Sequence, residues 1–237
     1  VRWKPDLEVF TDIAIPFEFF ESTLHRQAVV NPGISFVLRF EDRKEPGKFS
    51  EHRYLYENGI ADYIVELATD TARTEPVLWH METSGRDRDD KDEYRLKADF
   101  SFCVSPTVNV IEYYHNSSFL EYGGSPDRAV RQAFTYALDR YMKSNGKYTK
   151  NEAKITFGDI ADCLVLVINS FSTMTSYENQ TKKSITNSFI YEAMADFLRR
   201  NLEIYFTENP TEAEIFANQV LVNKRSRESA ESARINI

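Results

Sequence analysis

The sequence predicts an α+β fold, in which a mixed or antiparallel sheet carries helices on one face and the chain ends in a long helix. Three observations lead to this prediction. Residues 163–168 form a continuous apolar run, too short and too β-branched for a helix, which indicates a strand covered on both faces. Residues 94–104 and 108–114 alternate in polarity and predict paired antiparallel strands. Residues 127–142 and 184–207 repeat apolar side chains at helical spacing.

Residues 1–70 are expected to be the C-terminal portion of one domain, and both ends of the chain look cut, since residue 1 is valine. The boundary is placed near residue 70, where residues 69–74 lack a periodic pattern. The elements predicted before it are a strand at 1–3, a helix at 17–28, a strand at 34–40 with its returning strand at 54–56, and an amphipathic helix at 59–67.

Residues 71–237 are expected to form a second domain. Besides the elements named first, its predicted parts are a strand at 76–82, a solvated hairpin tip at 84–93, a polar loop at 115–125, a short helix and turn within 149–162, and a helix at 211–237. The apolar stripe of the last helix gives way to charge after Val222. Its far end is therefore expected to stand clear of the core.

Composition favours a globular chain with a substantial core, because 42% of its 237 residues are hydrophobic and 14% are aromatic. The sequence has neither a membrane-length apolar run nor a signal-peptide pattern, so the cytoplasm is the expected location and no membrane partner is expected. A net charge of −8 argues against a general nucleic-acid-binding surface. Any contact with a polyanion must therefore be local, and the alternative for each basic patch is a solvated helix face. The candidate contacts are Lys183, Arg199, Arg200, Lys224, Arg225 and Arg227.

Motifs for independent chemistry are missing from the sequence. The two cysteines, Cys103 and Cys163, lie in apolar runs and are expected to be small buried hydrophobic residues. The four histidines are too scattered for a zinc motif, and the acidic run at 87–90 lacks the spacing of a calcium loop. The sequence contains no phosphate-binding glycine-rich loop and no nucleophile elbow. We therefore expect no metal site and no enzymatic activity of this segment alone.

The most informative stretch is the polar loop at residues 176–184, between the buried strand and the long helix. Unpaired N–H groups and the helix dipole favour negative charge at a helix N-terminus, so the neighbouring lysines predict a site that favours phosphate. The residues alone also allow a lysine-bearing surface loop without such a role.

Gln180-Thr181-Lys182, in this position, resembles the glutamine-threonine-lysine loop of the B subunits of bacterial type IIA topoisomerases, DNA gyrase and topoisomerase IV. Six further motifs keep the order and spacing of that family, so the resemblance covers essentially the whole chain. These motifs are Arg2-Trp3-Lys4-Pro5-Asp6, Phe10, Asn31-Pro32-Gly33-Ile34, Tyr56-Glu57-Asn58-Gly59-Ile60, Gly158-Asp159-Ile160 and Asn223-Lys224-Arg225-Ser226-Arg227-Glu228.

The resemblance implies that residues 71–237 are the transducer domain, with a fold similar to ribosomal protein S5. It implies that Gln180 and Lys182 bind the γ-phosphate of ATP and that Lys182 has a catalytic role. The cofactors implied for the full-length subunit are ATP and Mg²⁺, with the Mg²⁺ ligands outside this segment. The implied partners are DNA, the A subunit in a heterotetramer and a second B subunit that pairs on ATP binding. The implied location is the cytoplasm, at the nucleoid.

Two other classes of function stay open at this point. Mismatch-repair and chaperone ATPases share the two-domain arrangement, although the Gln-Thr-Lys triplet and the basic final helix speak against them. A non-catalytic dimerisation or docking module of the same fold is the second alternative. The segments at 121–126 and 161–163 depart from the usual gyrase pattern, so the choice between gyrase and topoisomerase IV also stays open.

Overall fold

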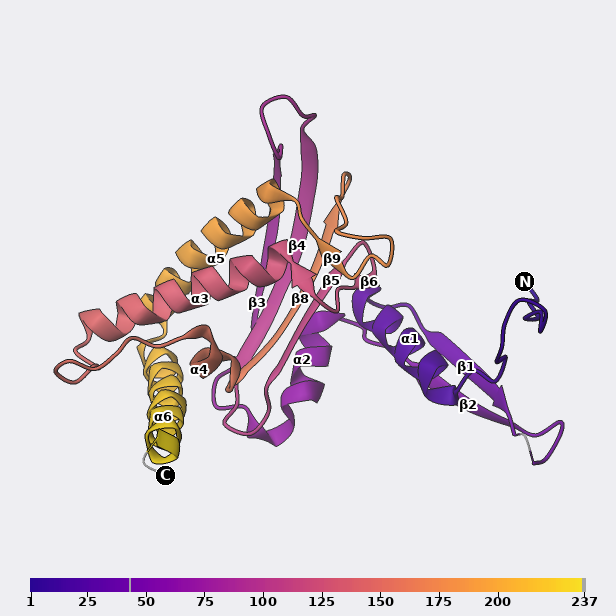
Figure 1. Cartoon of the computed structure of the whole chain (residues 1–237), viewed down its shortest axis with the longest axis horizontal. Helices are drawn as coiled ribbons and strands as arrows, with labels where there is room; N and C mark the ends of the chain where they lie inside the picture. Colours follow the sequence, from indigo (N-terminus) through magenta and orange to yellow (C-terminus); the bar gives the residue numbers. More distant parts are fainter. Residues whose placement is uncertain (43, 236–237) are drawn as a thin grey trace. The chain divides into compact units, whose positions relative to one another are not determined.

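The computed structural model describes residues 1–42 and 44–235 of the chain (Figure 1). The chain divides into two compact units, the first ending at Gly59 and the second beginning at Ile60. The assignment of residues 1–70 and 71–237 to two functional domains stays a prediction. Throughout the described part, no helix combines the length and apolar character that a membrane crossing needs.

The first unit consists of one helix on a two-stranded antiparallel sheet. Helix α1 (Phe17–Val30) contacts the hairpin of β1 (Phe36–Glu41) and β2 (Phe49–Tyr54). The predicted helix and first strand are confirmed, whereas the returning strand lies earlier than residues 54–56. The strand predicted at residues 1–3 is wrong, because these residues have no strand partner among the described residues and lie in irregular structure.

The second unit is built on a five-stranded mixed sheet in the order β3-β4-β8-β5-β6. Its strands are β3 (Val77–Gly85), β4 (Tyr94–Val104), β5 (Val110–His115), β6 (Ser118–Phe119) and β8 (Leu164–Ser172). The predicted pairing of β4 with β5 is wrong. Strand β8 lies between β4 and β5, antiparallel to the first and parallel to the second. This position is the most buried in the sheet, and it suits the most apolar strand.

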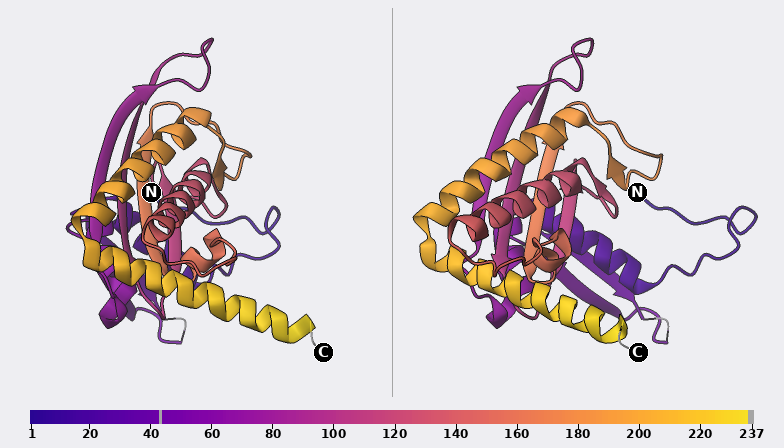
Figure 2. Two further views of the ribbon diagram at one scale, coloured as in Figure 1. Left: turned by 90° about the vertical axis from the view of Figure 1, so that its left-hand side faces the viewer. Right: turned by 60° about the vertical axis from the view of Figure 1, so that its left-hand side comes forward.

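Two long helices cover one face of this sheet, as predicted (Figure 2). In helix α3 (Ser125–Ser144), the ring centre of Phe134 lies 5.4 Å from that of Phe102. In helix α5 (Ser188–Glu208), the ring of Phe197 stacks on that of Phe100, with 5.2 Å between their centres. These aromatic contacts lie in the main hydrophobic core. The core therefore fixes both helices to strand β4.

Helix α2 (Ile60–Ala68) contacts β4 and β8 as well, and it is followed by a 3₁₀ turn, η1 (Thr69–Thr71). Buried residues such as Cys103 and Val165 alternate with those that face α3 and α5, so they point to the opposite face of the sheet. Helix α2 therefore covers part of that second face.

The chain ends in α6 (Pro210–Ile235), which contacts α5 and the short helix α4 (Phe157–Ala161). Its buried apolar side chains are in its first half, including Phe216 and Val220, whereas residues 229–234 are exposed, as predicted. Residues 236 and 237 of the predicted helix lie outside the described residues. Two very short strands, β7 (Gly123–Gly124) and β9 (Ser184–Ile185), form a separate parallel pair.

Candidate functional site

The polar loop between β8 and α5 is an ordered hairpin of residues 176–187. Tyr177 bridges to Ile185 across the hairpin, and the Glu178 N–H donates to the Ser184 carbonyl oxygen at 3.0 Å. At the base, the Thr186 N–H donates to the carbonyl oxygen of Ser176 at 2.8 Å. These hydrogen bonds between the two arms make the loop a narrow projection with a defined direction, which we call the 176–187 hairpin.

The tip of the hairpin is fixed by a side chain that bonds to its own turn. Asn179 Oδ1 accepts from the Thr181 N–H at 3.2 Å and from its hydroxyl at 2.5 Å. The Lys182 N–H donates to the carbonyl oxygen of Asn179 at 3.2 Å. Lys182 has φ of +57°, in the left-handed region that costs a non-glycine residue roughly 1 kcal/mol or more. A local turn motif therefore holds the lysine in a strained backbone conformation.

Gln180 and Lys182 are exposed at this tip. The Lys182 ammonium lies 5.5 Å from the ring centre of Tyr177. Across residues 1–42 and 44–235, no carboxylate forms an ion pair with it, and no hydrogen bond holds the Gln180 amide. The two side chains thus offer a positive charge and an amide N–H to a ligand from outside.

Lys183, the next residue, is used within the fold. Its ammonium forms an ion pair with Glu121 and lies 5.7 Å from the ring centre of Tyr122. The hydrogen bond to Glu121 raises the pKa of Lys183 above its ordinary value. Of the two neighbouring lysines, only Lys182 keeps its charge free of an ion pair within the described residues.

The parallel pair β7–β9 fastens the returning arm of the hairpin to the start of α3. The Tyr122 N–H donates to the carbonyl oxygen of Lys183 at 2.9 Å, and Gly124 is paired with Ile185. Gly124 has φ of +83°, and a Cβ atom there would lie 2.1 Å from the Ile185 carbonyl oxygen. Glycine is therefore required for this close approach of two backbones.

The N-terminus of α5 is occupied by a carboxylate from the β3–β4 connection. Asp87 Oδ1 accepts from the Phe189 N–H at 2.9 Å, and the Asp87 carbonyl oxygen accepts from the Ser188 hydroxyl at 2.8 Å. A negative charge at this position is stabilised by the helix dipole and satisfies an N–H group without an intrahelical partner. The prediction that this helix terminus is open to phosphate is therefore wrong. Lys182 stands at the other end of the hairpin.

A buried histidine holds the strand end that leads into the hairpin. His115, the last residue of β5, places Nδ1 2.8 Å from the Ser170 hydroxyl oxygen. Its Nε2 lies 2.9 Å from the hydroxyl oxygen of Ser172 and 3.0 Å from that of Thr175. Burial lowers the pKa of His115 to about 4, so the ring is neutral at pH 7. His115 therefore has a structural role at the end of β5.

Arg199 and Arg200 lie on α5. The Arg199 guanidinium is 2.6 Å from the Asp196 carboxylate and 5.4 Å from the ring centre of Tyr136 on α3. Arg200 is exposed and has no ion pair within the described part of the chain. Both arginines therefore remain accessible.

Sequence reasoning did not select two further arginines on α3 that have the same kind of environment. Arg128 lies 5.1 Å from the ring centre of Tyr191, and Arg131 lies 4.7 Å from that of Phe157. Such stacking orients a guanidinium while its edge stays available for hydrogen bonds.

The basic residues of α6 fasten that helix to the segment before β8. Lys224 is fully buried, and its ammonium lies 3.2 Å from Glu152 and 2.8 Å from Glu228. Arg225 makes two bonds to Glu152, at 2.9 and 3.0 Å. These contacts lower the pKa of Glu152, with the hydrogen bond from Arg225 as the largest cause. Lys224 and Arg225 therefore do not lie on a purely solvated helix face, and the buried Lys224 ammonium is not accessible to a ligand.

Arg227 binds a second buried carboxylate. Its guanidinium makes two bonds to Asp159 on α4, at 2.8 and 3.2 Å. Asp159 also accepts from the N–H and the hydroxyl of Thr156, at 2.8 and 2.9 Å. These hydrogen bonds outweigh burial and lower the pKa of the Asp159 carboxyl group.

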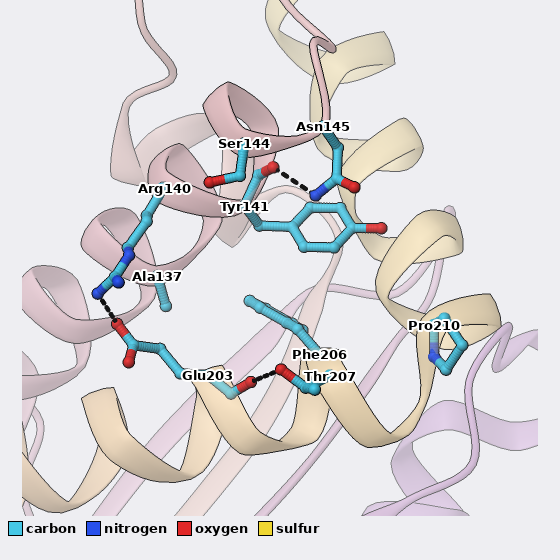
Figure 3. Close-up of a pocket in the computed structure, with 9 residues that line it drawn as sticks. All are labelled: Ala137, Arg140, Tyr141, Ser144, Asn145, Glu203, Phe206, Thr207 and Pro210. Carbon is cyan, nitrogen blue, oxygen red and sulfur yellow. Dashed lines mark hydrogen bonds and ion pairs between the residues drawn. The ribbon is translucent and has the colours of Figure 1, made fainter.

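A cavity of about 400 Å³ lies between the C-terminal parts of α3 and α5 (Figure 3). Arg140 and Glu203 close one side with an ion pair of 2.7 Å, and the rings of Tyr141 and Phe206 form part of its wall. The predicted site residues are not in its lining. This cavity is therefore separate from the 176–187 hairpin.

The chain is similar to known proteins along nearly its whole length. The family model described as DNA gyrase B matches residues 59–236. The DNA gyrase B chain of Cytophaga aurantiaca is 27% identical over 99% of this chain and 48% of its own length. That of Archaeoglobus fulgidus is 29% identical over 97% of this chain and 34% of its own length. The chain thus spans about half the length, or less, of these curated relatives.

Solved structures show the same fold. The 43K ATPase domain of Thermus thermophilus gyrase B, solved with an aminocoumarin, has a TM-score of 0.68 at 23% identity, over 99% of this chain and 60% of that one. The topoisomerase IV ATP-binding domain of Francisella tularensis, solved with a small-molecule inhibitor, has a TM-score of 0.66 at 20% identity, over 94% and 57%. At these identities the likeness concerns the fold alone.

Proposed function

Because the chain belongs to the DNA gyrase B family, we propose that it is the transducer-bearing segment of the B subunit in an ATP-dependent type IIA topoisomerase. In this proposal residues 71–237 are the transducer, and the 176–187 hairpin senses ATP held by the ATPase domain of the full-length subunit. The observation that carries the proposal is the Lys182 ammonium, which is exposed at the tip of an ordered hairpin and free of any ion pair within the described residues.

Lys182 and Gln180 are suited to bind phosphate oxygens. The ammonium is a point charge with three donors, and the amide adds a neutral donor beside it. Each charge-assisted hydrogen bond of this kind contributes about 1.5–3 kcal/mol. In phosphoryl transfer a cation at this position also stabilises the charge that develops in the transition state, which is the catalytic role that we assign to Lys182. ATP and Mg²⁺ are the cofactors of the whole subunit in this proposal.

Loss of the γ-phosphate would remove the partner of Lys182 and release the hairpin. The hairpin leads directly into α5, whose buried face is fixed in the core. Helix α5 continues into α6 through Asn209, whose N–H donates to the Tyr205 carbonyl oxygen of α5 and whose carbonyl oxygen accepts from the Ala213 N–H of α6, each at 2.9 Å. The Tyr205 hydroxyl also contacts Glu212 of α6. A displacement of the hairpin is therefore carried by rigid helices toward the end of α6, which we expect to connect to the DNA-gate region.

Contacts with DNA are proposed first for Arg128 and Arg200 on the α3–α5 surface, which form no ion pair within the described residues. Arg131 and Arg199 lie on the same surface but are bound to the carboxylates of Asp127 and Asp196, so they are secondary candidates. Arg225 and Arg227 are secondary candidates, because both are partly exposed but already bound to carboxylates. Lys183 is likewise a secondary candidate, because its ammonium is already bound to the Glu121 carboxylate. Lys224 is excluded, since its ammonium is buried. The proposed protein partners are the A subunit and a second B subunit that pairs on ATP binding, and the proposed location is the cytoplasm, at the nucleoid.

The test is Lys182→Ala in the full-length subunit, assembled with its A subunit. We expect ATP hydrolysis and ATP-dependent supercoiling or decatenation to fall at least tenfold, while the melting temperature of the variant stays unchanged. Lys150→Ala is the matched control, since Lys150 is an exposed lysine in a different loop. Unchanged hydrolysis and unchanged DNA topology changes in Lys182→Ala would refute the proposal.

A further inference from the structure

The base of the 176–187 hairpin is closed by one buried side chain, that of Asn187. This residue is 3% exposed, and its Oδ1 accepts from the Ser176 N–H at 2.8 Å, which joins the two arms. Its Nδ2 donates to Asp87 Oδ2 at 2.8 Å and to the Tyr94 hydroxyl at 3.1 Å. Its carbonyl oxygen accepts from the Ser125 hydroxyl at 2.7 Å. Asn187 thus connects the hairpin with the β3–β4 connection and with the start of α3.

Asp87 determines which way the Asn187 amide points. An ionised carboxylate only accepts hydrogen bonds, so the amide NH₂ group must face Asp87, and Oδ1 is left for the Ser176 N–H. Asp87 itself cannot turn away, because its Oδ1 accepts from the Phe189 N–H at 2.9 Å and from the Tyr94 hydroxyl at 2.8 Å. The orientation is therefore transmitted from the first turn of α5, through Asp87 and Asn187, to the base of the hairpin.

We propose that Asn187 and Asp87 are positioning residues, which fix the direction of the 176–187 hairpin and thereby the place that Lys182 reaches. This inference rests on the proposed function of Lys182 and adds to it the device that aims the lysine. It also assigns a task to the charged β3–β4 connection, which would otherwise be a solvated tip. The same bonds connect any tilt of the hairpin to the first turn of α5.

The reciprocal exchange of the two side chains provides a sharp test. In Asn187→Asp the residue keeps its size and its ability to cap a helix, but two carboxylates then face each other at hydrogen-bond distance. Combining it with Asp87→Asn restores one carboxylate and one amide in the same place. In the exchanged pair, the new amide donates to the new carboxylate, which still accepts from the Ser176 N–H. The net charge of the double variant equals that of the native chain.

The first measurement is amide hydrogen exchange in the 237-residue chain, which requires no nucleotide. We expect the protection of the Ser176 and Thr186 amides to fall at least tenfold in Asn187→Asp and to return to within threefold of the native value in the double variant. Asn145→Asp is the control. It changes an asparagine at the end of α3 whose side-chain amide donates to the Tyr141 carbonyl oxygen of its own helix at 2.8 Å, and it should leave the protection of the hairpin amides unchanged.

The second measurement is steady-state ATP hydrolysis by the full-length subunit. We expect kcat to fall at least fivefold in Asn187→Asp, with a rise in KM because the contact of Lys182 with the γ-phosphate is weakened, and we expect both quantities to recover in the double variant. A change in stability alone would alter neither quantity in this way, and Asn145→Asp controls for it.

The outcomes separate the two proposals. Unchanged hairpin protection in Asn187→Asp, or failure of the double variant to restore it, overturns the positioning role. Normal kcat in Asn187→Asp, in a subunit where Lys182→Ala is impaired, also overturns that role and leaves the proposed function intact. Normal kcat in Lys182→Ala overturns the proposed function instead. Loss and recovery of both protection and kcat support the positioning role.

Discussion

Mild acid is expected to destabilise the second unit through His115. The ring is buried against the hydroxyl groups of Ser170, Ser172 and Thr175, and its pKa is lowered from 6.5 to about 4. Below pH 6.5 the unfolded chain binds a proton at this residue, whereas the folded chain binds it only near pH 4. The unfolded state thus holds more protons between these values, so stability is complete above pH 6.5 and is lost as the pH falls toward 4.

The size of this effect follows from the shift in pKa. At about 1.4 kcal/mol for each pKa unit, the whole effect is about 3.5 kcal/mol. Between pH 7 and pH 5 the chain should lose about 2 kcal/mol of unfolding free energy through this residue. That is a large share of the 5–15 kcal/mol that is typical of a native domain.

The assay is urea unfolding at several pH values, followed by the fluorescence of Trp79, whose ring packs on Phe102 in the second unit. The comparison variant is His115→Gln, which cannot be protonated but keeps one donor and one acceptor. Other ionisable groups affect both proteins alike, so the difference in unfolding free energy isolates His115. We expect the unfolding free energy of the native chain, minus that of the variant, to fall by about 2 kcal/mol from pH 7 to pH 5. Parallel pH profiles of the two proteins would refute the reasoning.

Three further predictions concern other parts of the second unit. Gly124→Ala should cost more than about 3 kcal/mol in thermal unfolding, because its Cβ atom meets a backbone oxygen, whereas Gly146→Ala, also at positive φ but in open space, should cost only about 1 kcal/mol. Asp159→Asn should lower the unfolding free energy, measured by urea titration at pH 7, by about 1–3 kcal/mol. This difference should shrink in acid, where the native carboxylate is protonated. Burial raises the thiol pKa to about 11 for Cys103 and about 12 for Cys163, so neither should react with a thiol reagent at pH 8 until urea unfolds the chain.

Much of this fold could be predicted from the sequence because each long element has a clear periodic pattern. Helices α3, α5 and α6 carry apolar stripes at helical spacing, and their ends were predicted to within a few residues. The pairing of β4 with β5 could not be predicted correctly. A connection of only five residues favours a hairpin, and nothing local indicates that a strand some fifty residues later separates the two. Strand partners depend on tertiary packing rather than on local composition.

The candidate site was predictable only where a motif identified it. Gln180 and Lys182 stand at an exposed tip between the buried strand and the long helix, as the triplet and its surroundings suggested. The sequence presents Asp87 as one residue of a charged run, and composition does not reveal that its carboxylate caps a helix about a hundred residues later. Asparagine directly before an apolar helical pattern is a common N-cap, and Asn187 does stand at that position. Its side chain makes no cap bond, however, and bonds instead to Ser176, Asp87 and Tyr94, which the local pattern does not indicate.

The position of β8 has a consequence for how the chain forms during synthesis. Strands β3 and β4 can join as soon as they leave the ribosome, but the inner edge of β4 stays unpaired until residues 164–172 emerge. Sheet closure then requires β8 to insert between two strands that are already present, with contacts distant in sequence, and such steps are slow. The nascent chain therefore exposes an open β-edge for the synthesis time of about sixty residues, and during this interval the edge can pair with other chains.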